Sequence, residues 1–442
     1  MVKYQSQINM KKYTIALALA TASFTGFAQD VNKLIQQPEV ERLIKTLSAD
    51  DMQGRGTFTP GIDKAATFIE GEFKKIGLQP LTGATGFRQS FTVYRTVPAQ
   101  VNVTLDGKTI PAENVAIAAG ADFDWSSNSD VQVIKIGADQ NFQTEYRTYM
   151  RSGKKTLLLV DPKFEAFFKR LRTAVSGGNI TMEAPAANPQ QVVMVLGTYD
   201  GVKAFEVTYK TKTENPPIFN VAGMLKGKSK PDEYVVFSGH YDHLGIGKAM
   251  EGDSISNGAD DDASGTTAMI SLAKYYKKLN NNERTLIFVA FTAEEIGGYG
   301  ASYFSKQLDP EKTVAMFNIE MIGKQSKFGE NAAFITGYER SDFGEILQRN
   351  LKGTAFTFHP DPYPEQNLFY RSDNATLARL GVPAHTISTD QIDTDKLYHT
   401  VKDEFSSLDV ANITATIRAI ALSSRSIVAG TDTPKRIAKL ER

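Results

Sequence analysis

The sequence contains no cysteine, and this narrows the chemistry open to it. Its 442 residues include five histidines and no cysteine. Disulfide bonds, thiolate nucleophiles and cysteine metal ligands are therefore excluded. Any metal ion must be held by histidine, aspartate and glutamate side chains, which makes the position of each histidine informative.

The sequence also lacks an excess of charge of either sign. It has 50 Lys and Arg residues and 50 Asp and Glu residues. This balance argues against nucleic acid, or an anionic membrane surface, as the main partner. The chain is longer than an ordinary single domain and its hydrophobic fraction of 41% is enough for a substantial core. Two domains are therefore expected.

The N-terminal segment has an apolar run that is too short to span a bilayer, which needs about 20 apolar residues. Two lysines precede the run at 14–22, and the small-x-small sequence 26–28 follows it. This order is typical of a secretory signal peptide over residues 1–28, cleaved after Ala28. Because no cysteine stands at the cleavage site, a lipid anchor is excluded. We expect a periplasmic or secreted protein with no membrane anchor.

The stretch from 234 to 320 alternates predicted strands with helices. Consecutive apolar residues predict strands at 234–238, 286–291 and 315–319. A stripe of apolar residues predicts a helix at 264–279. Consecutive apolar positions suit a sheet that is covered on both faces. The fold class predicted is therefore a three-layer α/β/α sheet.

A change of pattern interrupts this alternation between residues 89 and 213. Short alternating strands dominate there, with one helix expected near 164–174, and the segment has no histidine and no carboxylate pair at ligand spacing. We interpret it as an inserted β-rich domain that acts as a lid or specificity module. The main domain is then formed by residues 29–88 together with 214–442.

Ligand-type side chains follow each of the three predicted strands. His240 and Asp242 come after the first strand, Glu294 and Glu295 after the second, and Glu320 after the third. Open α/β sheets place their sites at the carboxyl ends of strands. Two adjacent carboxylates at the end of a buried strand are unfavourable unless a cation neutralises them.

Two other segments add residues of the same kind. The run Asp260-Asp261-Asp262 precedes the predicted helix, whose positive N-terminus favours ionised carboxylates, and His399 lies in a later polar loop. Each feature alone has an ordinary explanation, such as a helix cap or a solvated loop. Together, two histidines and three carboxylates are the donors that two zinc ions need, with one carboxylate bridging. One carboxylate of the adjacent glutamate pair then remains free to act as a general base.

These segments resemble the successive motifs of the co-catalytic zinc aminopeptidases. That family also includes glutamate carboxypeptidase-type enzymes and glutaminyl cyclases. The motifs are, in order, GHYDHLG, NGADDDASG, FTAEEIGGYGA, NIEMIG, RSDNATLARLGVPA and YHTVKDEF. The resemblance covers about 217–426 and implies a zinc peptidase domain that acts on peptides. The insert lies where some members carry a protease-associated domain.

The resemblance implies two zinc ions and a role for each candidate residue. One zinc ion would bind His240 and Glu320, the other Glu295 and His399, and Asp261 would bridge them. Glu294 would take a proton from the attacking water and pass it to the leaving amine. Asp242 would orient His240. The peptide between Asp261 and Asp262 would be cis, which is rare before a residue other than proline.

Two positions depart from the family pattern. Glu320 stands where many members have Asp, and its extra methylene could alter the coordination. Asn374 stands where many members have His, so a substrate contact made there is in doubt. The remaining histidines, His243, His359 and His385, have no ligand role in the family, and we expect them to be structural.

An aminopeptidase is the favoured function, since one zinc ion can hold a free amino group while both polarise the scissile carbonyl. The first alternative is a carboxypeptidase or dipeptidase, whose mark would be an arginine cluster for a carboxylate; Arg340 and Arg371 are the candidates. A glutaminyl cyclase is disfavoured because cyclases of this family keep a single zinc. A non-enzymatic binding relative is disfavoured by the intact ligands and Glu294.

Overall fold

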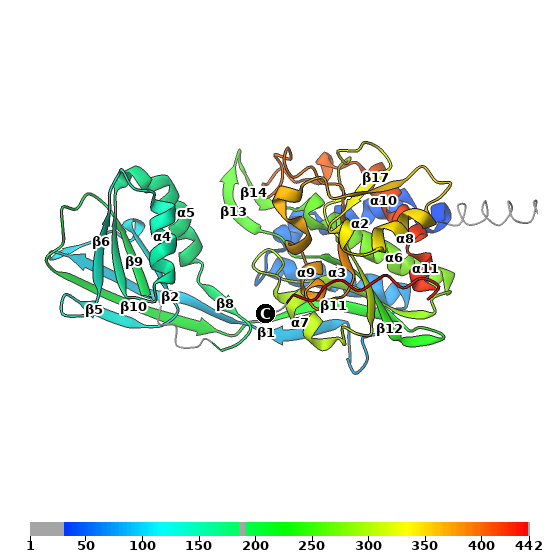
Figure 1. Cartoon of the computed structure of the whole chain (residues 1–442), viewed down its shortest axis with the longest axis horizontal. Coiled ribbons are helices and arrows are strands. Elements are labelled where there is room, and N and C mark those ends of the chain that lie inside the picture. Colours follow the sequence, from blue (N-terminus) through cyan, green and yellow to red (C-terminus); the bar gives the residue numbers. More distant parts are fainter. Residues whose placement is uncertain (1–30, 185–190, 441–442) are drawn as a thin grey trace, which may run out of the picture. The chain divides into compact units, whose positions relative to one another are not determined.

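The computed structural model describes residues 31–184 and 191–440. The predicted signal peptide and its cleavage site lie outside these residues. The chain divides into two compact units (Figure 1): one consists of the residues up to Ser90 and from Ile218 onward, and the other is Phe91–Pro217. Within the described ranges, no helix combines the length and the apolar character that crossing a bilayer requires.

The first unit is built around an eight-stranded sheet with the order β1-β11-β15-β12-β16-β19-β17-β18. Strands β12, β15, β16 and β19 run parallel, whereas β11 and β17 run antiparallel to their neighbours β15 and β19. The parallel strands therefore end at one edge. The bounds are β1 Arg88–Thr92, β11 Pro217–Leu225, β12 Lys230–His240, β15 Arg284–Phe291, β16 Thr313–Ile319, β17 Ala332–Ile335, β18 Thr357–Pro360 and β19 Ala384–Ser388.

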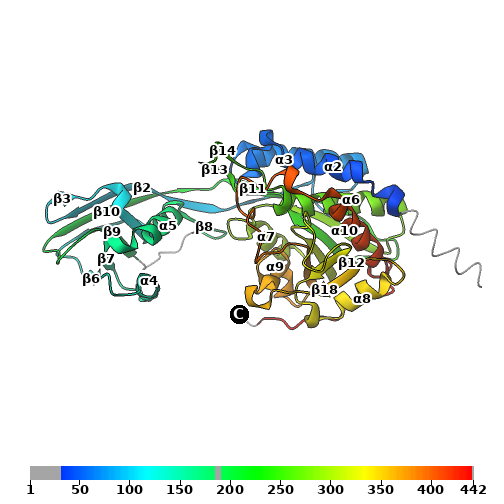
Figure 2. The same ribbon diagram turned by 90° about the horizontal axis from the view of Figure 1, so that it is seen from above.

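Helices cover both faces of this sheet (Figure 2). Val235 and Phe237 of β12 belong to the core shared with α2, α3, α6, α8 and α10, whereas Val236 belongs to the core shared with α7 and α9. Successive residues of a strand point to opposite faces, which explains the consecutive apolar residues and confirms the predicted three-layer fold. The helices are α2 Gln37–Leu47, α3 Pro60–Ile76, α6 Gly265–Leu279, α7 Tyr299–Gln307, α8 Phe343–Asn350, α9 Asn374–Ala378, α10 Val410–Ser423 and α11 Arg425–Val428.

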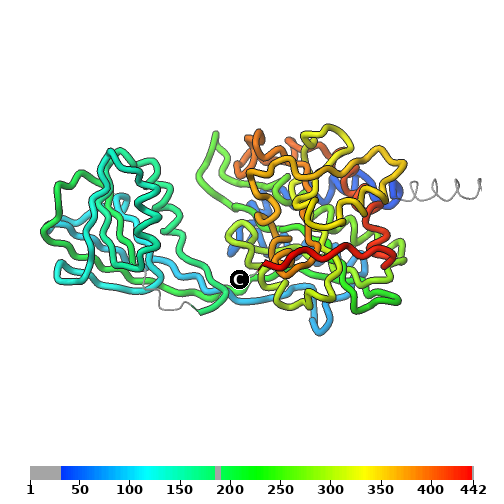
Figure 3. Tube along the Cα trace, in the orientation of Figure 1, coloured from blue at the N-terminus to red at the C-terminus, as the bar shows by residue number. Residues whose placement is uncertain are grey.

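The N-terminal helices are integral to this unit. Helix α3 begins at Pro60, whose fixed φ suits the first turn, and is capped by Gly77 with a φ of 81°. Helix α2 packs against α10, so segments from opposite ends of the chain lie side by side (Figure 3). Arg418 of α10 donates to the carbonyl oxygen of Ile35 at 2.8 and 3.0 Å.

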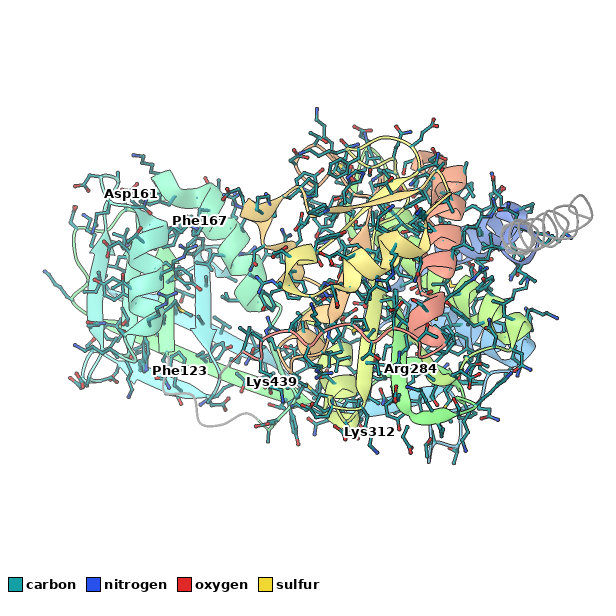
Figure 4. All side chains as sticks on the ribbon, turned by 45° about the vertical axis from the view of Figure 1, so that its right-hand side comes forward. Phe123, Asp161, Phe167, Arg284, Lys312 and Lys439 are labelled. Carbon is teal, nitrogen blue, oxygen red and sulfur yellow. The ribbon has the colours of Figure 1, made fainter. Side chains whose placement is uncertain are left out.

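The amino-terminal edge of the sheet carries a buried arginine whose donors are well partnered. Arg284 begins β15 (Figure 4) and is 1% exposed. Its Nε donates to Glu233 at 2.6 Å, and its other nitrogens donate to the carbonyl oxygens of Ile427 and Asp432 and to the Thr433 hydroxyl. This charge is therefore compensated within the fold.

The second unit contains a five-stranded sheet, β3-β2-β10-β5 with β8 beside β2, and a four-stranded sheet, β4-β9-β7-β6. Helices α4 and α5 pack on the four-stranded sheet. The predicted helix near 164–174 is α5, whereas α4 was missed because its polar sequence buries only Phe142 fully. The bounds are β2 Tyr94–Leu105, β3 Lys108–Thr109, β4 Val115–Ala119, β5 Phe123–Ser126, β6 Gln132–Ile136, α4 Phe142–Arg151, β7 Thr156–Val160, α5 Glu165–Ser176, β8 Asn179–Thr181, β9 Gln191–Leu196 and β10 Phe205–Glu214. The role of this unit as a lid or specificity module stays a prediction.

Candidate metal centre

The carboxyl edge of the parallel strands brings the predicted site residues together. They come from the end of β12, from the turn η4 (Ala259–Ser264) that leads into α6, from the segments after β15 and β16, and from a loop before α10. His240, Asp242 and Asp261 are buried, Glu294, Glu295 and Glu320 are partly buried, and the side chain of His399 is 37% exposed. The seven predicted residues are His240, Asp242, Asp261, Glu294, Glu295, Glu320 and His399.

One group of ligand atoms lies around His240. His240, Asp261 and Glu320 each offer one ligand atom, and these atoms lie within 4.8 Å of one another. The Nε2 of His240 is 3.1 Å from the Oδ1 of Asp261. The Oε2 of Glu320 is buried and has no hydrogen-bond partner among the described residues. An imidazole nitrogen and two carboxylate oxygens in this arrangement fit a divalent cation.

A second group lies around Glu295. Its Oε1 is 2.7 Å from the Nδ1 of His243, and its Oε2 is 3.1 Å from the Nε2 of His399. Both imidazoles also approach the Oδ2 of Asp261, at 3.8 Å from His243 and 3.2 Å from His399. Asp261 therefore presents one oxygen to each group, as a bridging ligand would.

His243 lies beside the second group, and the expectation that this residue is structural stays a prediction. His243, Asp261 and Glu295 offer ligand atoms within 4.8 Å of one another, and His243 is 2% exposed. His243 follows His240 by three residues. After a bend in the chain, this spacing lets both imidazoles lie at the same edge of the sheet. The family pattern did not include this residue, so the spacing was overlooked.

The other two histidines have contacts that fit a structural role. His385 is buried, with its Nε2 2.8 Å from the Ser341 hydroxyl and its Nδ1 2.8 Å from the carbonyl oxygen of Thr336. His359 stacks on Phe328 with ring centroids 4.0 Å apart. Neither belongs to the candidate centre.

Asp242 makes different contacts from those predicted. Its carboxylate accepts hydrogen bonds from the backbone N–H groups of Glu294 at 3.1 Å and Glu295 at 3.3 Å, and from the Thr57 hydroxyl at 3.3 Å. The Nδ1 of His240 lies 3.1 Å from the backbone carbonyl oxygen of Asp242 but 3.8 Å from its carboxylate. Asp242 thus fixes the glutamate pair through its side chain and orients His240 through its backbone. Burial raises the pKa of Asp242 to about 6.

The three consecutive aspartates have separate partners. The peptide bond between Asp261 and Asp262 is cis, which confirms the prediction. The carboxylate of Asp262 accepts the N–H groups of His240, Gly265 and Met321 at 3.0 to 3.2 Å. The N–H groups of Asp260 and Asp261 donate to Asp403, at 3.0 Å for the shortest contact of each. Asp262 therefore joins the ends of β12 and β16 to the start of α6.

Arg55 was not predicted, yet it braces the backbone of the centre. Its side chain is fully buried although it comes from the N-terminal segment. The guanidinium donates to four carbonyl oxygens at 2.5 to 2.8 Å, those of Leu47, Tyr241, Asn257 and Gly258. It thereby ties the segment after β12 to the segment before α6, and it places a positive charge near the buried aspartates.

Several backbone conformations at this edge are uncommon. Ala293, Met321 and His399 have φ values of 59°, 50° and 57°, in the left-handed region that non-glycine residues rarely adopt. At Gly239, an added Cβ would lie 2.8 Å from the Asp262 carboxylate. Strained residues of this kind cluster at functional sites, where the surrounding fold holds them in place.

The electrostatics of the centre show an excess of buried negative charge. Burial raises the pKa of Glu320 to about 7 and that of Glu294 well above its usual range. Asp373 is 2% exposed, and neither of its carboxyl oxygens has a hydrogen-bond partner among the described residues. Contacts with Asp261 and Glu295 outweigh burial and raise the pKa of His399 to about 10. Clustered carboxylates of this kind fit cations that would neutralise them.

A cavity of about 230 Å³ opens beside the two groups. Its lining includes Asp261, Glu294, Glu295, Glu320 and His399, together with a mixture of apolar and polar side chains. The candidate centre therefore faces a space that can admit part of a ligand. Arg371 and Tyr398 also line the cavity. Arg340 instead stacks over the Phe369 ring at 4.8 Å.

One protein-family model matches this part of the chain. Residues 220–423 match the model of peptidase family M28. This part of the chain is therefore similar to peptidase family M28. The matched span contains every predicted ligand and also His243.

Curated relatives match parts of the chain. A probable zinc metalloprotease of Leptosphaeria maculans is 34% identical over 111 residues, which are 25% of this chain and 25% of the relative. Aminopeptidase YwaD of Bacillus subtilis is 25% identical over 225 residues, which are 49% of this chain and 45% of the relative. The chain therefore spans between a quarter and just under half of the length of these relatives.

Solved structures match a larger part of the chain. An aminopeptidase from Aneurinibacillus sp. strain AM-1 has a TM-score of 0.57 at 16% identity, with 93% of this chain and 97% of that chain covered. The zinc aminopeptidase BSAP from Bacillus subtilis has a TM-score of 0.55 at 17% identity, with 89% and 95% covered. At this level of identity, the likeness shows a common fold.

Proposed function

We propose that this protein is a secreted, zinc-dependent aminopeptidase that removes N-terminal residues from peptides, with two zinc ions in the candidate centre. The observation that carries the proposal is the position of Asp261 between two groups of ligand atoms. His240 and Glu320 would hold one ion, Glu295 and His399 the other. His243 contacts the same Glu295 carboxylate and is a second nitrogen donor for that ion.

Zinc bound here would polarise the scissile carbonyl and acidify a water molecule. Glu294 would then accept the proton from the water and deliver it to the leaving amine. Its position supports this role, because it lines the cavity beside the ligands without being needed to complete either group. Asp242 holds the backbone N–H of Glu294 and so fixes where the base stands.

Tyr398 differs in chemical character from the predicted base, Glu294, because its hydroxyl is a neutral hydrogen-bond donor. It lines the cavity, and burial together with the nearby carboxylates raises its pKa above the usual range, so the hydroxyl keeps its proton. A retained phenol proton can be donated to negative charge that develops on the scissile carbonyl oxygen. The ring stacks on His399 with centroids 3.9 Å apart, which restricts its orientation.

A second candidate function rests on Arg371. This guanidinium lines the same cavity, and arginine binds carboxylates through paired hydrogen bonds. A carboxypeptidase or dipeptidase would use such a residue to hold the C-terminus of its substrate. Arg340, the other candidate, is engaged by aromatic rings and does not line the cavity.

One experiment separates these functions. The zinc-loaded protein is assayed on one peptide in three forms: unmodified, N-acetylated and C-amidated. The aminopeptidase proposal predicts that acetylation abolishes cleavage and amidation leaves it nearly unchanged. Cleavage that is blocked by amidation, and weakened in an Arg371→Gln variant, would assign the carboxypeptidase function instead. Equal cleavage of acetylated and free peptides would overturn the aminopeptidase proposal.

A further inference from the structure

The cavity beside the candidate centre is lined by a further acidic residue, Asp390, which is not one of the predicted metal ligands. Asp390 follows β19 at the same edge of the sheet and lines the cavity together with Thr336 and Ser388. Apolar side chains form another part of the lining, namely Phe334, Leu368 and Ile392. The cavity therefore combines apolar surface, along which methylene groups can pack, with a carboxyl group that is not needed for the metal centre.

The carboxyl group of Asp390 is incompletely partnered. Asp390 is 4% exposed, and its Oδ1 has no hydrogen-bond partner among the described residues. Asp260, Asp390 and Asp395 each offer a carboxylate oxygen within 4.8 Å of the others. Lys324 lies 3.2 Å from Asp260 and 2.6 Å from Asp395, whereas no described cation lies within ion-pair distance of Asp390.

This arrangement leaves Asp390 able to receive a positive charge. A buried carboxyl with a free oxygen is unfavourable unless a donor or a cation reaches it. Burial, together with the charges of Asp260 and Asp395, raises the pKa of Asp390 to about 8, so the free protein holds this group largely protonated at neutral pH. A cation placed beside it would favour the ionised form.

We propose that Asp390 selects substrates whose N-terminal residue has a cationic side chain, lysine or arginine. This inference rests on the proposed aminopeptidase function. The apolar lining would pack against the methylene groups of such a side chain, which lysine and arginine bury readily while their charged ends reach a polar partner. Asp390 would receive the ammonium or guanidinium group.

A bound metal ion is the other cation that this acidic group could attract, and the structure favours the substrate side chain. Lys324 already forms ion pairs with Asp260 and Asp395, so its ammonium group occupies the place between these carboxylates that a metal ion would need. Asp390 also shares its cavity with Asp261 and Glu294. A residue bound for cleavage at the centre would therefore have its side chain within the space that Asp390 lines.

The test compares substrates that differ in charge but hardly in shape. The pairs are the 4-nitroanilides of arginine and citrulline, and those of lysine and norleucine. We expect kcat/KM of the wild-type protein to favour the charged member of each pair by about tenfold or more, the range for a hydrogen bond to a charged group. In Asp390→Asn, this ratio should fall toward one.

The matched control is Asp393→Asn, the same chemical change on an exposed residue of the same loop that does not line the cavity. It should keep the wild-type ratio. Equal cleavage within each pair by the wild-type protein, or an unchanged ratio in Asp390→Asn, would overturn the assignment of Asp390 alone. Failure to cleave any of the four anilides would overturn the proposed function as well.

Metal analysis of the same samples gives a readout that does not depend on turnover. The proposal predicts the same metal content in the wild-type protein and in Asp390→Asn. A third metal ion per chain that is lost in Asp390→Asn would assign these carboxylates to a cation site and overturn the proposal. If Asp390→Asn fails to fold, the ratio between arginine and citrulline substrates in the wild-type protein still decides the charge preference.

Discussion

The two units of the chain use aspartates that precede helices in different ways. In the unit Phe91–Pro217, strands β6, β7 and β9 are parallel, and Asp161 follows β7 (Figure 4). Its carboxylate accepts the N–H of Lys163, two residues later, at 2.9 Å. In the other unit, the carboxylate of Asp262 bonds to His240 and Met321, which are 22 and 59 residues away.

A carboxylate after a parallel strand is therefore not by itself a site. A local bond, such as the one made by Asp161, satisfies the carboxylate as a turn cap. The other unit instead brings carboxylates from several strand ends together, with imidazoles between them. Convergence, burial and nitrogen donors distinguish the candidate centre from an ordinary strand-to-helix turn.

The largest expected effect is on the catalytic rate and comes from replacing Glu294. The matched control replaces a carboxylate of the other unit. Glu294→Gln keeps the shape but cannot accept a proton, so the rate should fall by about 100-fold or more, while zinc content and melting temperature stay nearly unchanged. Asp161→Asn, the matched change in the other unit, should leave the rate unaltered. Peptide hydrolysis and zinc analysis of both variants check this. Full activity of Glu294→Gln would remove the basis for the hydrolytic mechanism.

The second comparison uses a buried arginine at each edge of the sheet. Arg55→Lys keeps the charge but loses the fork that reaches four carbonyl oxygens, so the ligand segments should be held less well and zinc affinity should fall by roughly 10- to 100-fold. Arg284→Lys should lower the melting temperature without changing zinc affinity, because it lies at the amino-terminal edge. Competition with a chelator measures the affinities. Equal losses of zinc affinity in both variants would show that general destabilisation is the cause.

A smaller effect is expected at His243. Replacing it with Gln removes a nitrogen donor from Glu295, and zinc affinity should fall by about tenfold. His359→Gln, a change outside the centre, serves as the control and should have no effect on zinc affinity. A zinc titration of both variants decides between the two roles. Identical affinities would return His243 to the structural role that the sequence had suggested.

The smallest effect on metal binding is expected from removing the unit Phe91–Pro217 and joining Ser90 to Ile218 by a short flexible linker. This unit has no histidine, so zinc content should stay the same while the preference among peptide substrates changes. Elemental analysis and a panel of peptides measure both properties. Loss of zinc from a folded deletion variant would mean that the metal centre depends on this unit.

Much of the sheet and of the centre could be predicted from local patterns. The consecutive apolar residues of β12, β15 and β16 report burial on both faces, and the polar residues after each strand share an edge because the strands are parallel. The cis peptide bond between Asp261 and Asp262 was predicted from the resemblance to the family. These features follow from short segments, so a single sequence is enough to find them.

The features that were missed depend on contacts between distant segments. Arg55 reaches the centre from nearly 190 residues away in the sequence, at the carbonyl oxygen of Tyr241, and its surroundings in the sequence contain no ligand-type pattern. Asp403 receives the N–H groups of Asp260 and Asp261, again from a remote loop. Such partners follow from the packed fold, and no periodicity or motif points to them.

The presence of two zinc ions is tested by the zinc content of the active wild-type protein, taken by elemental analysis during a zinc titration of the metal-free chain. The two groups that share Asp261 predict that activity rises with added zinc and reaches its maximum at two zinc ions per chain. Full activity with one zinc ion per chain, or with none, would contradict a two-metal centre at the carboxyl edge of the sheet.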